Sequence, residues 1–148
     1  MTWAECSPAV TAASAPEEQL EISGEADIVA ARQHAREAAR ALGFGAVDQS
    51  RITTAVSELT RNVVRYADGG RGRVSIRQLS GPRGVGLEVI VSDTGPGIAD
   101  VEEAMRAGFT SGSGLGLGLP GTRRLMDEMD IDSAVGRGTT IRICKWRR

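Results

Sequence analysis

The fold of this chain is decided by residues 88–98, EVIVSDTGPGI. An apolar strand leads directly into Asp93, which is therefore held at the strand's end, and Gly95 and Gly97 then let backbone approach a flat ligand closely. An ionised carboxylate accepts hydrogen bonds and donates none, so Asp93 can select a ring with an exocyclic amine, such as adenine. The alternative interpretation is an ordinary Asp-Thr-Gly-Pro turn.

The segments before this stretch predict a β-hairpin and a helix. Residues 73–79 and 86–92 are β-rich and are separated by the turn sequence SGPRG. A helix is predicted over about residues 48–66, with an apolar stripe formed by Ile52, Val56, Leu59 and Val63. Beside it runs a polar stripe of Thr54, Glu58 and Asn62. A solvated helix face would also explain this polar stripe.

The polar stripe has a chemical interpretation as well. The carboxamide oxygen of Asn62 is a hard ligand suited to Mg²⁺, which keeps several waters and takes further oxygens from substrate phosphates. Glu58 can hold a ligand water or accept a proton from an attacking hydroxyl.

The stretch after Asp93 contains a second glycine-rich segment, TSGSGLGLGLPGTRRLMDEM. Gly112, Gly114, Gly116 and Gly118 lie just before a predicted helix over residues 119–129, so their N–H groups and the helix N-terminus would form an anion site. The segment is neither a Walker A sequence nor a Rossmann turn. The alternative is a flexible linker.

The remaining elements complete an α/β pattern. A first helix is expected from Asp27 as the N-cap, ending at Gly43 and Gly45, and two short strands are expected at residues 131–135 and 139–145. This order predicts a two-layer α/β sandwich, with helices on one face of a mixed sheet. Residues 1–18, rich in Ala, Ser, Pro and Glu, are predicted to be a mobile leader before a domain at residues 19–148.

Composition excludes several classes of protein. The net charge of -1 over 148 residues gives no attraction to nucleic acid or to an anionic membrane. Cys6, Cys144 and the single His34 supply neither metal-ligand spacing nor a disulfide framework. No apolar run approaches the ~20 residues needed to span a bilayer. We therefore expect a cytoplasmic protein.

Taken together, the motifs resemble those of the GHKL ATPases, which have the Bergerat fold. Residues 58–62 resemble the N box, residues 93–97 the G1 box, residues 112–118 the G2 box and the GTT at residues 138–140 the closing threonine motif. The resemblance covers roughly residues 20–145.

Within that superfamily, four segments resemble the anti-sigma-factor serine kinases, and especially the RsbT-type switch kinases. They are SELTRNVVRYA, DTGPGI, GLPGTRRLMDEMDI and GTTIRICKW. The resemblance implies an ATP- and Mg²⁺-dependent kinase that phosphorylates a serine of a STAS-domain antagonist protein. It also implies a regulatory target, such as a phosphatase or a sigma factor, and allows a homodimer.

The resemblance also implies a role for each motif residue. Asn62 corresponds to the Mg²⁺ ligand, Glu58 to the catalytic base, Asp93 to the acceptor for the adenine amine and Thr139 to a hydroxyl near adenine. Gly95 and Gly97 correspond to close-approach positions, and the glycines of residues 112–118 to a phosphate-covering lid. Sporulation-type kinases carry a basic lid residue where this chain has FTSGSG, so the γ-phosphate clamp is unassigned and the RsbT-type branch is favoured.

Three other functions compete with this one. A nucleotide-dependent anti-sigma binding module with little kinase activity would share the motifs. A dimeric aspartic protease also has Asp-Thr-Gly after an apolar strand, but Pro96 stands where a small residue is usual. The ATP domain of a histidine kinase is disfavoured because the chain has no room for a phosphoacceptor dimerisation domain.

Overall fold

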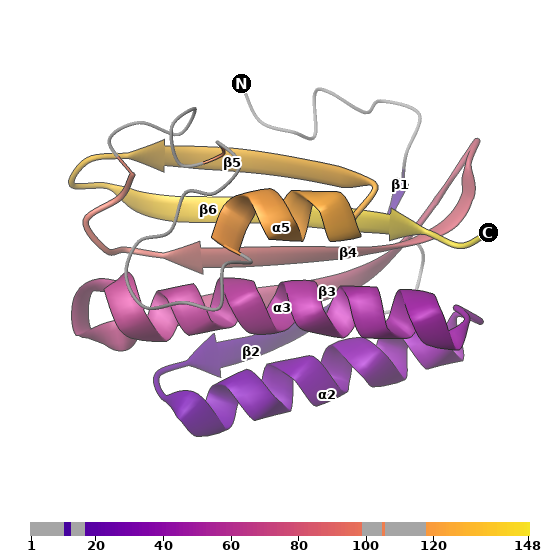
Figure 1. Ribbon diagram of the computed structural model, residues 1–148, viewed down its shortest axis with the longest axis horizontal. Coiled ribbons are helices and arrows are strands. Elements are labelled where there is room, and N and C mark those ends of the chain that lie inside the picture. Colours follow the sequence, from indigo (N-terminus) through magenta and orange to yellow (C-terminus); the bar gives the residue numbers. More distant parts are fainter. Residues whose placement is uncertain (1–10, 13–16, 99–104, 106–117) are drawn as a thin grey trace.

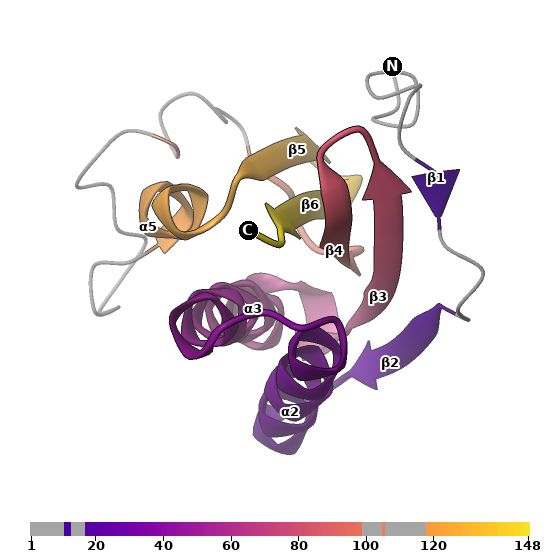
Figure 2. The ribbon, with the colours of Figure 1, turned by 90° about the vertical axis from the view of Figure 1, so that its right-hand side faces the viewer.

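The computed structural model describes residues 11–12, 17–98, 105 and 118–148. Three helices, α2 (Glu25–Ala41), α3 (Ala46–Tyr66) and α5 (Gly118–Leu125), form one layer, and a sheet forms the other (Figures 1 and 2). The strands are β1 (Thr11–Ala12), β2 (Glu18–Ile22), β3 (Gly72–Gly81), β4 (Gly84–Asp93), β5 (Glu128–Ala134) and β6 (Gly138–Trp146), and a short 3₁₀ turn, η1 (Asp68–Gly70), precedes β3. The predicted sandwich with helices on one face is confirmed.

The prediction of a mixed sheet is wrong, because every strand pair among the described residues is antiparallel. The strand order is β1-β3-β4-β6-β5, with β2 also paired to β3. The chain path explains this. Two helices, α2 and α3, return the chain to the end at which β2 finished, and tight turns join β3 to β4 and β5 to β6. Strands β4 and β5, between which α5 is the helix among the described residues, run in the same direction, but β6 lies between them (Figure 1).

Two predicted helix boundaries are also wrong. Helix α5 ends at Leu125 rather than at residue 129, because Glu128 and Met129 pair with Cys144 and Ile143 of β6. Helix α2 begins at Glu25, with Gly24 as its N-cap, and Asp27 instead accepts hydrogen bonds from the N–H and hydroxyl of Ser23. Pairing between distant strands and local capping choices both override the helical pattern at these points.

The core lies between the two layers. Alternate residues of a strand point to opposite faces, so each strand presents one row of side chains to the helices. The rows of β4 and β6 that pack in the core consist of Leu87, Val89, Val91, Ile141 and Ile143. Against them lies α3, with Ile52, Val56 and Leu59 at 0–1% exposure. None of the described helices is long and apolar enough to cross a membrane.

Part of the predicted leader pairs with the sheet. Thr11 and Ala12 lie opposite Ser80 and Leu79 of β3, and β2 begins at Glu18. Both segments lie along the same edge of β3. The division of the chain into a leader and a domain stays a prediction.

Candidate functional site

The polar stripe predicted on α3 is the partly open strip along the buried middle of this helix. Between Ile52 and Thr60, every residue is buried except Thr54 and Glu58. The strip continues through Arg61 and Asn62, which are also half-buried. The residue types that can bind a polar ligand are thus the ones that the packing leaves accessible.

Two buried hydroxyl groups of α3 bond back to the helix backbone at this level. Ser57 donates to the carbonyl oxygen of Thr53 at 2.8 Å, and Thr60 donates to that of Val56 at 2.7 Å. These bonds satisfy polar atoms that burial would otherwise leave unpaired. Glu58 lies between the two donor residues, and its carboxylate Oε1 accepts a hydrogen bond from Nη1 of Arg61 at 2.8 Å.

Asp93 ends the core-facing row of β4. It follows Leu87, Val89 and Val91 in the alternation along the strand, so it lies at the edge of the space between sheet and helices. Its Oδ1 accepts the N–H of Gly95 at 2.8 Å, which fixes the carboxylate just past the strand end. Asp93 itself is only half-buried. A fixed, accessible acceptor is what recognition of an exocyclic amine requires.

The core-facing rows of side chains on β6 and β5 also end beside Asp93. Thr139 of β6 is its direct partner across the ladder, and Thr139 Oγ1 lies 2.8 Å from Oγ of Ser133, at the corresponding end of β5. Ser133 Oγ in turn accepts the N–H of Ile98 at 2.8 Å and donates to the carbonyl oxygen of Gly138. This hydroxyl pair ties the turn after Asp93 to the β5–β6 hairpin.

Glycine is needed at this turn because backbones pass very close to one another. A Cβ on Gly97 would lie 2.1 Å from the carbonyl oxygen of Ala134, and one on Gly138 would lie 2.1 Å from that of Asp93. Both glycines have positive φ, +79° and +92° respectively. For Gly97, contact with the protein's own backbone is a sufficient reason for glycine, beside the predicted approach to a ligand. Gly95 is buried.

Helix α3 and the end of β4 meet through Gly72. Gly72 is the ladder partner of Asp93, and a Cβ on it would lie 2.7 Å from Cγ1 of Val63 and 2.4 Å from the carbonyl oxygen of Ser92. Val63 directly follows Asn62. In Figure 1 the C-terminal half of α3, the ends of β4 and β5 and the starts of β6 and α5 all lie at the left of the molecule. We call this region, with Glu58, Asn62, Asp93, Ser133 and Thr139, the Asp93 end.

The predicted lid residues fall mostly outside the described chain. Gly112, Gly114 and Gly116 lie in the segment that the structure does not describe. Gly118 opens α5 with φ +47°, and its carbonyl oxygen accepts the hydroxyl of Thr122 at 2.9 Å. Helix α5 packs beside α3 (Figure 2).

Sequence reasoning missed three residues of this end. Arg61 could have been found from its i, i+3 spacing to Glu58, at which helix side chains meet. Ser133 and Gly72 carry no local signal, because their importance comes from segments far away in the sequence. Among the described residues, no group of three or more His, Cys, Asp or Glu side chains is placed to hold a metal ion.

Comparison with known proteins identifies the class. Residues 47–148 match the family described as histidine kinase-, DNA gyrase B-, and HSP90-like ATPase. The match covers more than half of the chain, so the chain belongs to this family, the GHKL superfamily that the motifs indicated.

The chain is also similar to individual proteins of known name. The serine/threonine-protein kinase RsbT of Bacillus subtilis (strain 168) is 51% identical over 129 residues, which are 87% of this chain and 96% of that protein. An anti-sigma F factor of Caldanaerobacter subterraneus subsp. tengcongensis is 36% identical over 99 residues, or 64% of this chain and 68% of that protein. The resemblance to RsbT-type and anti-sigma-factor kinases is therefore confirmed.

Solved structures share the fold. The RsbU and RsbW domains of a Mycobacterium tuberculosis protein superpose with a TM-score of 0.63 at 20% identity, over 90% of this chain and 33% of that one. The mycobacterial sensor histidine kinase MprB gives a TM-score of 0.53 at 22% identity, over 90% of this chain and 99% of that one. At these identities the likeness concerns the fold alone.

Proposed function

We propose that this chain is an ATP- and Mg²⁺-dependent protein serine kinase that phosphorylates a STAS-domain antagonist and binds a regulatory target, such as a phosphatase or a sigma factor. The observation that carries the proposal is that Glu58 and Asn62 lie on the open strip of α3, next to Val63, which packs on Gly72, the ladder partner of Asp93. The 51% identity to a protein named serine/threonine-protein kinase supports it. A cytoplasmic location and a homodimer stay predictions from the sequence.

The described residues fit a nucleotide. Asp93 offers a rigid acceptor for the adenine amine, and Thr139 supplies a hydroxyl beside it. Asn62 provides one oxygen for Mg²⁺, which would complete its shell with water and phosphate oxygens. Bound Mg²⁺ would neutralise charge on the phosphates. The lid, with Gly112, Gly114, Gly116 and Gly118, would contribute N–H groups to them.

Glu58 is the proposed base. As the oxygen of the acceptor serine bonds to the γ-phosphorus, its proton passes to the Glu58 carboxylate, and the bond between the γ-phosphorus and its bridging oxygen breaks to release ADP. A general base typically contributes about 10²–10⁴-fold to a rate. Glu58→Ala should therefore lower phosphate transfer by about 10²–10⁴-fold while nucleotide binding, measured by calorimetry, stays close to wild type. Unaltered transfer would reject this role.

The direct test is phosphorylation followed by intact mass. The chain is incubated with Mg²⁺-ATP and a STAS-domain protein encoded near it in the genome, and both proteins are weighed. A gain of one phosphate on the STAS protein, lost when its acceptor serine is replaced by alanine, supports the proposal. No gain over the same time rejects it.

The anti-sigma F factor relatives favour a second candidate, a nucleotide-dependent binding module with little kinase activity. It predicts a stable complex with a sigma factor that forms in ATP and leaves every partner's mass unchanged. The same incubation, followed by gel filtration, separates the two functions.

A further inference from the structure

A charged pair on α3 connects the proposed base to a residue with no role assigned so far. Nη1 of Arg61 lies 2.8 Å from Oε1 of Glu58, and the two side chains are 35% and 13% exposed. A guanidinium is a planar fork of donors, and the hydrogen bond from its Nη1 limits where Oε1 can lie as well as neutralising charge. The pair lies on the open strip, directly before Asn62.

The contribution of this pair to the stability of the fold is expected to be small. Ion pairs at i, i+3 on a helix contribute little to folding when solvent reaches them. The same helix provides a comparison: Nη1 of Arg51 lies 3.0 Å from Oδ1 of Asp48, also at i, i+3, but near the other end of α3. Both pairs join an arginine to a carboxylate on α3, but the Asp48 pair lies far from Asn62, and Asp48 also has Nζ of Lys145 at 3.9 Å.

We propose that Arg61 is a positioning residue for phosphoryl transfer, holding Oε1 of Glu58 so that the other carboxylate oxygen faces the acceptor hydroxyl. This inference rests on the proposed function. Misplacing a reacting group by about 1 Å can cost on the order of 100-fold in rate. Arg61 therefore acts on transfer through Glu58, and its contribution vanishes when Glu58 is absent.

A double-mutant cycle tests this dependence. Wild type, Arg61→Gln, Glu58→Gln and the double variant are compared for phosphate transfer to the STAS protein, for affinity for ATP by calorimetry and for melting temperature. We expect Arg61→Gln to lower kcat about 10- to 100-fold with unchanged ATP affinity and unchanged KM for the STAS protein. The double variant should transfer no more slowly than Glu58→Gln alone.

Two matched variants separate positioning from a structural effect. Arg51→Gln removes the same charge from the same helix and should leave transfer within twofold of wild type. Arg61→Lys keeps the charge but loses the fork, and should recover only part of the rate lost in Arg61→Gln.

The outcomes distinguish the two proposals. Suppose that wild type transfers phosphate. The role of Arg61 is rejected, and the kinase assignment stands, if Arg61→Gln transfers at the wild-type rate or raises only KM. The same holds if the rate of the double variant falls by the product of the two single losses. If wild type transfers no phosphate, the kinase assignment fails and the role of Arg61 fails with it.

Discussion

Strand β4 carries two acidic side chains on opposite faces, and their surroundings differ completely. Asp93 lies on the face toward the helices, is half-buried and has one carboxylate oxygen fixed by the N–H of Gly95. Glu88 lies on the face away from the described helices, at 2% exposure, and forms ion pairs with both Arg77 and Arg142. The first stays accessible to the nucleotide that we propose it binds, whereas the second is ion-paired within the protein.

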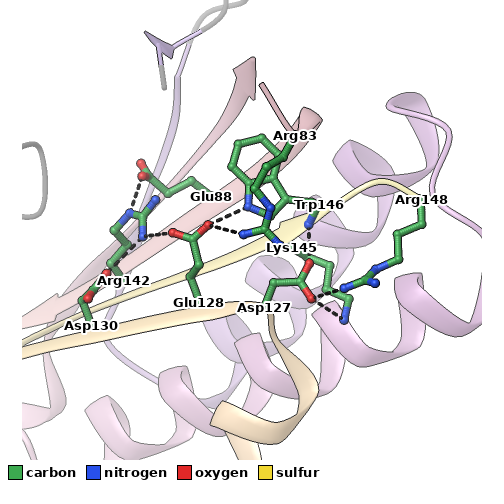
Figure 3. A network of polar contacts seen from close by, with 9 residues as sticks. All are labelled: Arg83, Glu88, Asp127, Glu128, Asp130, Arg142, Lys145, Trp146 and Arg148. Carbon is green, nitrogen blue, oxygen red and sulfur yellow. Dashed lines mark hydrogen bonds and ion pairs between the residues drawn. The ribbon is translucent and has the colours of Figure 1, made fainter. Parts of the chain in front are cut away.

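The ion pairs around Glu88 form a connected network, which we call the ion-paired face (Figure 3). Nε of Arg142 lies 2.7 Å from Glu88, and its Nη1 lies 3.2 Å from Glu128 and 3.1 Å from Asp130. Burial alone would lower the pKa of Arg142, but hydrogen bonds and charges from Glu88 and Glu128 outweigh it and raise the pKa. Carboxylates are thus bound to arginine on one face of β4 and kept available on the other.

The largest effect is expected from Asp93→Asn, which should abolish detectable nucleotide binding. The asparagine carbonyl can still accept the N–H of Gly95, but its NH₂ group would then meet the adenine amine donor to donor. Calorimetry with ATP measures the loss. Because no buried ion pair is broken, the melting temperature should stay within a few degrees of wild type. Binding close to wild type would remove Asp93 from the site.

The converse variant is Glu88→Gln, which should lower the free energy of unfolding and leave nucleotide binding at the Asp93 end unchanged. Removing one partner of a buried ion pair costs about 3–5 kcal/mol, and we expect the lower figure because Arg142 keeps Glu128 and Asp130. Urea denaturation measures the free energy of unfolding. Glu21→Gln is the control, because its pair with Arg73 is 74% and 55% exposed and contributes little. A loss of ATP affinity in folded Glu88→Gln would show that the two faces are coupled.

The residues on the two faces of β4 also differ in how well the sequence predicted them. Asp93 was identified because strand, carboxylate and glycines are contiguous, and the helix strip because Glu58 and Asn62 follow the helical repeat. Glu88 looked like part of an apolar strand, since its partners Arg77 and Arg142 lie on other strands, 11 and 54 residues away. The start of β5 was missed for the same reason, because Glu128 joins the sheet by pairing with Cys144 of β6. Strand direction likewise depended on the chain path, which local pattern does not contain.

A smaller effect is expected from Ser133→Ala at the Asp93 end. This change leaves the N–H of Ile98 and the hydroxyl of Thr139 without their partner, which should cost about 1–2 kcal/mol of unfolding free energy. Because the turn after Asp93 loses its attachment to β5, ATP affinity should fall several-fold as well. Ser50→Ala, at an exposed position of α3, serves as the control. A stability loss without any change in ATP affinity would limit Ser133 to a structural role.

The smallest expected effect belongs to Asp127, at the border of the ion-paired face, and it depends on pH (Figure 3). Burial alone would raise the pKa of Asp127, but the N–H of Trp146 and the charges of Arg148 and Lys145 outweigh it and lower the pKa below 3.8. A lowered folded-state pKa means that Asp127 stabilises the fold above the unfolded-state pKa, and that this contribution disappears as pH falls through the folded-state value.

The measurement is urea denaturation of wild type and Asp127→Asn at a series of pH values from 7 to 2. Wild type should be the more stable at neutral pH, and the two unfolding free energies should converge in acid, because protonated Asp127 no longer attracts Arg148 and Lys145. The difference should be smaller than that for Glu88→Gln, since Arg148 is 70% exposed and water screens its charge. Asp132→Asn, whose pair with Arg137 is 60% and 67% exposed, should show little difference at any pH. A gap between wild type and Asp127→Asn that stays constant down to pH 2 would mean that hydrogen bonding rather than charge holds this end of β5 and β6 together.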